Sequence, residues 1–225
     1  PPPPPPPPFF NDTATTEIYT RVGSSAASDV YKRQGGPSAL MQLFGAFAEP
    51  PSCAFFVAQH MPGGFTRGFA ERLNRLTNLS AREARGGDEP EAGTILVAPG
   101  ESHLEFATKE DRVVTLLAPR MHTDKYAPAV DRMFESAAKH FGSDLLAVVL
   151  TGMGDDGRRG VQAVKEHGGR VIAESEETAV IFGMPQRAIR TGFVDAVLPL
   201  SEIATAIQSG IGGSESKTIH RKGST

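Results

Sequence analysis

The chain has 225 residues, with 26 acidic and 23 basic side chains and a net charge of -3. This mildly acidic balance gives no electrostatic attraction to nucleic acid or to an anionic membrane surface. The apolar runs are too short to span a bilayer, and a single cysteine, Cys53, excludes an internal disulfide or a cysteine-based metal cluster. In its apolar surroundings Cys53 is expected to be a small buried hydrophobe, and the chain is expected to be cytoplasmic.

The segment 1–34 does not resemble protein sequence. Residues 11–20 (NDTATTEIYT) are the translation of AATGATACGGCGACCACCGAGATCTACAC, a sequencing flow-cell adapter. Residues 25–34 (SAASDVYKRQ) are the translation of TCGGCAGCGTCAGATGTGTATAAGAGACAG, a transposase adapter, and the prolines of 1–8 are what a run of C would encode. We therefore interpret 1–34 as an adapter-derived leader and expect it to be disordered, although a natural leader rich in Pro, Ser and Thr would have a similar composition.

From Gly35 onward, short apolar runs alternate with helical patterns, which is typical of an α/β fold with a largely parallel sheet. The periodicity predicts helices over 37–47, 65–76, 130–141, 157–167, 185–190 and 201–207. It predicts strands over 53–58, 94–98, 104–107, 113–117, 144–150, 171–173 and 194–198, with a more antiparallel section between 94 and 117. We expect 35–208 to form one doubly wound, Rossmann-like domain with flanking helices, followed by a flexible tail over 209–225.

Three loops of this domain carry residues suited to chemistry. They contain Gly35-Gly36 before the first helix, His60 after strand 53–58 and Asp156 after strand 144–150. Because functional groups gather at the carboxyl ends of parallel strands, His60 and Asp156 can meet as a base and its orienting carboxylate. Each residue alone has a simpler interpretation, since a single histidine at a strand end is more often structural. Asp155, just before a helix, is expected to cap that helix.

The loop 152–157 (GMGDDG) also fits the G-x-G-x-x-G pattern of dinucleotide binding, and Glu174 follows where a ribose-binding acid could lie. A pyrophosphate would, however, meet two carboxylates in this loop. At about 4 Å and an effective dielectric of about 20, each repulsion costs roughly 4 kcal/mol. A nucleotide-binding module using Gly152–Gly157 is therefore the weaker alternative. The other histidines show no metal-ligand spacing, so no metal and no cofactor is expected.

Six collinear segments carry a family resemblance. They are GGPSAL (35–40), QHMPGGFTRGFAERLN (59–74), ILVAPGESHLE (95–105), APAVDRMF (127–134), LTGMGDDG (150–157) and GMPQRAI (183–189). Together they resemble the catalytic domain of the bacterial chemotaxis protein-glutamate methylesterase, also a protein-glutamine glutaminase. The resemblance implies a cytoplasmic hydrolase of receptor glutamyl methyl esters, with a methylated chemoreceptor helical bundle as partner. It also implies a receiver domain in many full-length members.

Carried over position by position, the resemblance implies that His60 is the general base and Asp156 is its orienting acid. The backbone N–H groups of Met153 and Gly35 take the place of oxyanion donors. More weakly, Met61, Arg72 and Met184 are expected to line the substrate crevice. For Arg72 a solvated surface arginine is the simpler interpretation, and for Asp131 we expect a structural role at the start of a helix.

The nucleophile position departs from the family pattern. In the family a Ser-Thr pair ends the first strand and directly precedes the two glycines, whereas this chain has Arg33 and Gln34 there. Neither residue can form an acyl-enzyme, and Ser38 lies inside the predicted helix, facing elsewhere. Segment 29–33 could fill the slot of the missing first strand, but it would turn a cation toward buried surface. We therefore expect the polypeptide as written to be inactive and poorly stable, or to act as a receptor-binding pseudoenzyme.

Overall fold

The computed structural model describes residues 15–21 and 35–209. Its main sheet contains the strands β1 (Thr15–Arg21), β2 (Cys53–Gln59), β3 (Ser80–Glu83), β4 (Thr94–Val97), β7 (Leu146–Val149), β8 (Arg170–Glu174) and β9 (Ala196–Leu198). A separate hairpin is formed by β5 (Ser102–Lys109) and β6 (Arg112–Pro119). The helices are α1 (Gly35–Gly45), α2 (Phe65–Leu76), α3 (Val130–Phe141), α4 (Arg158–Glu166), α5 (Met184–Ile189) and α6 (Leu200–Gln208), with a 3₁₀ turn η1 (Gly142–Asp144).

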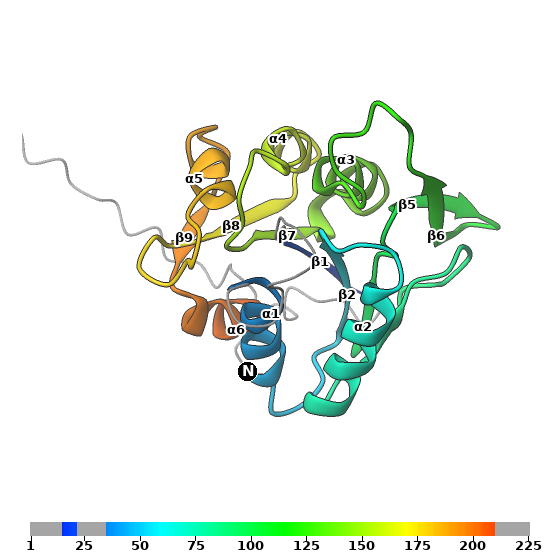
Figure 1. Cartoon of the computed structure of the whole chain (residues 1–225), viewed down its shortest axis with the longest axis horizontal. Helices are drawn as coiled ribbons and strands as arrows, with labels where there is room; N and C mark the ends of the chain where they lie inside the picture. The colour runs from blue at the N-terminus through cyan, green and yellow to red at the C-terminus, as the bar shows by residue number, and fades with distance from the viewer. Residues whose placement is uncertain (1–14, 22–34, 210–225) are drawn as a thin grey trace, which may run out of the picture.

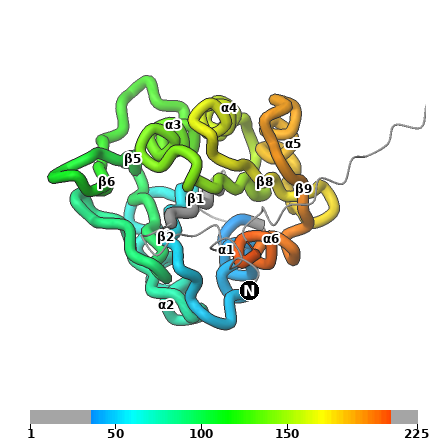
Figure 2. Tube along the Cα trace, turned by 180° about the vertical axis from the view of Figure 1, so that it is seen from behind, coloured from blue at the N-terminus to red at the C-terminus, as the bar shows by residue number. Residues whose placement is uncertain are grey.

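The main sheet lies between two layers of helices (Figure 1). Its strand order is β3-β4-β2-β1-β7-β8-β9, and all neighbouring strands run parallel. Helices α1, α2 and α6 cover one face, and α3, α4 and α5 cover the other, with α6 beside α1 in both views (Figures 1 and 2). The predicted doubly wound α/β fold is therefore confirmed.

Strand β2 shows how the sequence builds two cores from one strand. All seven of its residues are buried, which explains its nearly continuous apolar run. Successive side chains point to opposite faces, so Phe55 joins the cluster under α1, α2 and α6. Phe56 joins the cluster under α3 and α4. The ring of Phe44 on α1 lies 5.2 Å from that of Phe55, and Phe106 of the hairpin lies 4.7 Å from Phe56.

The centre of the sheet differs from the expectation for the leader. Disorder was predicted throughout 1–34, but Thr15–Arg21 forms β1 and pairs with both β2 and β7. Without a strand there, the facing edges of β2 and β7 would keep unpaired backbone N–H and C=O groups in the interior. The Thr, Ile and Tyr residues of β1 suit a strand. Segment 29–33, predicted as the candidate for this slot, lies outside the described residues.

Three further differences concern element boundaries. Helix α1 begins two residues before the predicted start at Pro37, which lies in its first turn. Strand β3 was not predicted, because it is a short edge strand whose alternating pattern is mostly polar. The predicted antiparallel section proves to be the β5–β6 hairpin. Its turn residues Glu110 and Asp111 have φ of 50° and 61°, the left-handed values that a tight hairpin turn requires.

Two predictions from composition can be compared with the structure. Cys53 is 1% exposed at the start of β2, which confirms its place in the core. Within 15–21 and 35–209, no helix has both the length and the apolar character that crossing a bilayer requires. The predicted flexible tail falls almost entirely on 210–225, which lies outside the described residues.

Candidate active site

His60 and Asp156 come together at the carboxyl edge of the sheet. His60 directly follows β2, and Asp156 lies in the loop between β7 and α4. Because the two strands run parallel on either side of β1, their carboxyl ends open on the same side. The His60 Nε2 atom lies 2.8 Å from Asp156 Oδ2, although the residues are 96 positions apart. The structure thus brings together the two side chains that the sequence singled out.

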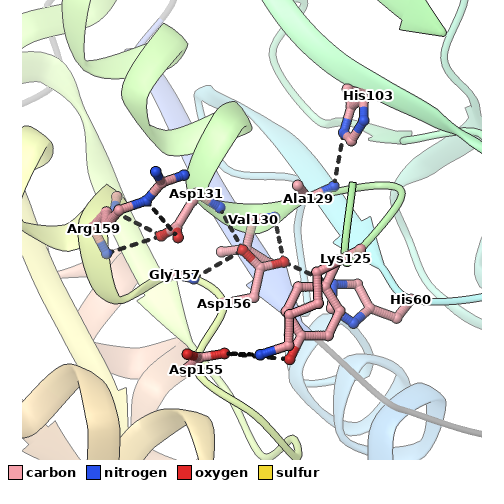
Figure 3. A network of polar contacts seen from close by, with 12 residues as sticks. His60, His103, Lys125, Ala129, Val130, Asp131, Asp155, Asp156, Gly157 and Arg159 are labelled. Carbon is pink, nitrogen blue, oxygen red and sulfur yellow. Dashed lines mark hydrogen bonds and ion pairs between the residues drawn. The ribbon is translucent and has the colours of Figure 1, made fainter. Parts of the chain in front are cut away.

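Backbone N–H groups hold the Asp156 carboxylate in place (Figure 3). Val130 donates to Oδ2 at 2.8 Å, and Asp131 donates to Oδ1 at 2.8 Å. Gly157 donates to Oδ1 at 3.1 Å. Asp156 itself is only 4% exposed. Val130 and Asp131 begin α3, so the carboxylate satisfies N–H groups that have no partner within that helix. The positive end of the α3 dipole favours its negative charge.

Asp131 caps the N-terminus of the next helix, α4, in the same way. Its Oδ1 accepts the backbone N–H groups of Arg159 and Gly160 at 2.9 and 2.8 Å, at the start of α4. The Arg159 Nε also donates to Asp131 Oδ2 at 3.2 Å. Burial raises the pKa of Asp131, and the nearby charge of Asp156 acts in the same direction. Helices α3 and α4 are therefore capped reciprocally, each by an acid from the other's N-terminal region, which agrees with the structural role expected for Asp131.

The hydrogen bonds define which nitrogen of His60 is available. An ionised carboxylate has no hydrogen to donate, so Asp156 can only accept a hydrogen bond from His60 Nε2. In the neutral imidazole, Nε2 is therefore the nitrogen that carries the proton. Nδ1 then has a lone pair, and it makes no hydrogen bond within the described part of the chain. A histidine in this arrangement can accept a proton at Nδ1 while Asp156 stabilises the resulting imidazolium.

The loop after β7 presents an open backbone donor. Gly154 and Gly157 have φ of 109° and 94°, which L-residues rarely adopt, so glycine is required at both turns. Gly152 is held by hydrogen bonds from its N–H to Ile181 O and from Met184 N–H to its carbonyl. The Met153 N–H makes no hydrogen bond to any residue that the structure describes, and the residue is 52% exposed. It is thus free to donate to a ligand at the site.

The segment 120–129, for which no helix or strand was predicted, supplies further parts of the site. The Tyr126 ring stacks on the His60 ring, with centroids 4.5 Å apart and planes 18° apart. The Tyr126 hydroxyl donates to Asp155 Oδ1 at 3.3 Å, and Lys125 Nζ donates to the same oxygen at 2.7 Å. These bonds, Lys125 first, lower the pKa of the Asp155 carboxyl, and the bond to Asp155 raises that of the Lys125 ammonium. The prediction that Asp155 caps α4 is wrong, because its carboxylate is turned toward this segment and Gly157 is the N-cap residue.

A cleft of about 790 Å³ adjoins the site on the side of α4. Its walls carry both signs of charge, because Lys125 pairs with Asp155, Arg159 pairs with Asp131, and Arg190 also lines the cleft. Among the described residues, no group of three His, Cys, Asp or Glu side chains has the arrangement of a metal site.

The remaining predicted site residues lie in varied places. Met61 is partly buried against the core beneath α1, and Arg72 is exposed on α2 with no ion pair in the described part of the chain. Met184 is 1% exposed and packs into the other core, so its side chain does not line an open crevice. Gly35 is the first residue of α1, and Ser38 is exposed within that helix, as predicted. Arg33 and Gln34 lie outside the described residues.

Glu174 argues against the nucleotide alternative. It is fully buried, and its Oε2 accepts the Thr151 N–H at 2.7 Å while its Oε1 accepts the Thr178 hydroxyl at 3.0 Å. Both carboxylate oxygens are engaged in holding loops together. The residue therefore cannot reach a ribose, and the loop of Gly152–Gly157 keeps two aspartates where a pyrophosphate would lie.

Comparison with known proteins shows which family the chain resembles. A family profile described as CheB methylesterase matches residues 32–207, which includes Arg33 and Gln34 but excludes β1. "Protein-glutamate methylesterase/protein-glutamine glutaminase 1" of Myxococcus xanthus is 47% identical over 173 residues, which are 77% of this chain and 50% of that protein. "Protein-glutamate methylesterase/protein-glutamine glutaminase 2" of Pseudomonas aeruginosa is 47% identical over 174 residues, 77% of this chain and 49% of that protein. The chain thus spans about half the length of the curated relatives it matches.

A solved structure agrees with these relatives. The crystal structure of the Thermotoga maritima CheB methylesterase catalytic domain is 34% identical, with a TM-score of 0.78. The similarity covers 87% of this chain and 98% of that domain. Fold, sequence and the collinear segments therefore agree, and the chain belongs to the CheB methylesterase family.

Proposed function

We propose that this domain is the catalytic part of a serine-type protein-glutamate methylesterase. The observation that carries the proposal is the His60–Asp156 pair, with Nε2 held at 2.8 Å and Nδ1 open. The pair lies at the carboxyl edge of the sheet, where the first strand ends. Arg21, the last residue of β1, pairs in register with Gln59, the residue before His60. A serine ending that strand would meet the open nitrogen of the imidazole.

The proposed reaction proceeds in two halves. The serine oxygen attacks the carbonyl carbon of a glutamyl methyl ester while His60 takes the serine proton at Nδ1. The Met153 N–H, with that of Gly35, donates to the oxyanion. His60 then gives its proton to the departing methoxide, so that methanol leaves and an acyl-enzyme forms. Water attacks this ester with His60 again as base, which frees the serine and the glutamate. A glutamine would react in the same way with loss of ammonia.

We infer a cytoplasmic protein whose partner is the helical bundle of a methylated chemoreceptor. The names of the relatives support a protein glutamate ester and a protein glutamine as substrates. No cofactor is needed, since proton transfer and acyl transfer use only side chains and backbone donors. A receiver domain in the longer protein is proposed from the family resemblance.

The chain as written carries Arg33 where the nucleophile is expected, so we propose that it is inactive. Replacing residues 15–34 with the first strand of a family member, which ends in Ser-Thr directly before Gly35, gives a variant that we call the serine-restored chain. We expect the serine-restored chain, mixed with methylated receptor bundle, to release methanol, and the original chain to release none. His60→Ala in the serine-restored chain is the matched control and should abolish release. A serine-restored chain that folds, judged by circular dichroism, yet releases no methanol would overturn the proposal.

A receptor-binding pseudoenzyme is the second candidate, favoured by Arg33 itself. Sequencing the source locus across the codon for Gly35, with a method free of these adapters, separates the two. A genomic strand ending in Ser-Thr supports the active enzyme. A genomic Arg33-Gln34, together with receptor binding and no turnover, supports the pseudoenzyme.

A further inference from the structure

Tyr126 covers one face of the imidazole at the centre of the site. Its ring centroid lies 4.5 Å from that of His60, and the two planes differ by 18°. Tyr126 lies between β6 and α3, far from His60 in the sequence, and it is not one of the proposed triad residues. The contact therefore joins a separate part of the fold to the base.

The stack supplies a restraint that the hydrogen bond to Asp156 lacks. A single hydrogen bond at Nε2 fixes one atom of the imidazole but leaves the ring free to turn about that bond. A parallel aromatic neighbour fixes the plane of the ring, and with it the direction of the Nδ1 lone pair. Proton transfer depends on this direction, because a base is effective only when it is aimed at the proton that it abstracts.

Tyr126 is itself held from two sides. Its hydroxyl donates to Asp155 Oδ1, which Lys125 also contacts, and the pKa of Asp155 is lowered mainly by Lys125, which keeps this carboxylate ionised. The hydroxyl also lies over Gly154, where an added Cβ would stand only 2.5 Å from the hydroxyl oxygen. The ring therefore sits in a fitted position between the loop after β7 and His60.

A buried histidine secures the segment that carries Tyr126. His103 Nε2 lies 2.8 Å from Asp124 Oδ2, and the Ala129 N–H donates to His103 Nδ1 at 3.2 Å. Asp124 Oδ2 also accepts the Met121 N–H at 2.7 Å. Both ends of the segment around Tyr126 are thus tied to one fully buried imidazole.

We propose that Tyr126 is a positioning residue for the general base, fixing the ring plane of His60 so that Nδ1 faces the nucleophile. This inference rests on the proposed function for its catalytic consequence, but not for its structural content. The electron-rich face of Tyr126 also stabilises the imidazolium that forms when His60 accepts a proton, as aromatic faces do for other cations.

The structural content can be tested on the chain as it stands by proton NMR of histidine imidazole N–H groups. Hydrogen bonding to Asp156 and Asp124 should give His60 and His103 separate downfield signals, assigned by the loss of the first in His60→Gln. In Tyr126→Leu the His60 signal should broaden or vanish while the His103 signal remains, whereas Tyr126→Phe should retain both. His122→Gln, an exposed change in the same segment, is the control and should retain both signals. A sharp His60 signal in Tyr126→Leu, or its loss in Tyr126→Phe, would overturn the proposal.

The catalytic content is tested in the serine-restored chain. Tyr126→Leu should lower kcat by about 10- to 100-fold, with KM changed by less than about 3-fold, because misdirection of the base affects the chemical step. Tyr126→Phe, which retains the stack, should keep kcat within about 3-fold of the parent value. An equal fall in kcat for both variants would contradict a role for the ring. If the serine-restored chain releases no methanol at all, the proposed function fails, while the NMR result still decides the role of Tyr126.

Discussion

The part of the chain that the structure describes contains two histidine–aspartate pairs of nearly identical geometry. In both His60–Asp156 and His103–Asp124, Nε2 lies 2.8 Å from Oδ2, and the same Oδ2 also accepts a backbone N–H, from Val130 at Asp156 and from Met121 at Asp124. They differ at the other ring nitrogen. Nδ1 of His103 accepts the Ala129 N–H, whereas Nδ1 of His60 has no partner among the residues that the structure describes.

This difference separates a structural pair from the pair that we propose to be reactive. Nδ1 of the fully buried His103 is already occupied by the Ala129 N–H, so it cannot serve as a proton acceptor without breaking that hydrogen bond. His60 can take up a proton without losing any of its contacts. A carboxylate next to a histidine is therefore not enough to identify a base, and the free nitrogen is the distinguishing feature.

The largest expected effect concerns the acid of the reactive pair. Asp156→Asn in the serine-restored chain should lower kcat by about 10⁴-fold, because an amide favours the wrong imidazole tautomer. Its NH₂ group must also face backbone N–H donors, which should lower the free energy of unfolding by about 1–3 kcal/mol. Methanol release and urea denaturation measure the two effects. Asp144→Asn, an exposed change in η1, is the matched control, and a comparable loss of activity there would remove the special role of Asp156.

The second prediction reverses the roles of the two histidines. His103→Gln should lower the free energy of unfolding by about 1–3 kcal/mol, because it disrupts the packing of a fully buried ring and leaves the Ala129 N–H and the partly buried Asp124 carboxylate poorly paired. His60→Gln should cost about 1 kcal/mol or less, since Asp156 keeps its three backbone donors. Urea denaturation of both variants at neutral pH tests this order. Equal losses of stability would mean that the two pairs serve the fold alike.

The smallest expected effect is a pH dependence at the structural pair. The Met121 N–H and then His103 hold the pKa of Asp124 below its ordinary value of 3.8. A carboxyl with a lowered folded pKa contributes stability above its unfolded value, and this contribution is lost as the pH falls through the folded value. Asp124→Asn should therefore be less stable than the parent at pH 7, and the gap should narrow below about pH 4. A gap that stays constant in urea denaturation over this range would contradict the prediction.

Most of the fold, and the contact between the two proposed catalytic residues, could be predicted from the sequence for physical reasons. Phe65–Leu76 and Val130–Phe141 were predicted with their observed bounds because their apolar periodicity is strong. His60 and Asp156 could be paired because parallel strands bring their carboxyl ends together. Tyr126 could not be predicted, since it lies in an aperiodic segment whose path depends on the buried His103. Asp155 was misassigned because local capping preference gave no sign of the competing contact with Lys125.

Asp156 also bears on how genomes should be searched for active members of this family. Since its carboxylate satisfies the first N–H groups of α3 as well as the base, the folded domain needs this residue whether or not the chain hydrolyses esters. An intact aspartate, or a strong family match, is therefore evidence of the fold rather than of catalytic activity. The position two residues before Gly35, where the family resemblance places the nucleophile, is the one to inspect when a survey asks which relatives still catalyse.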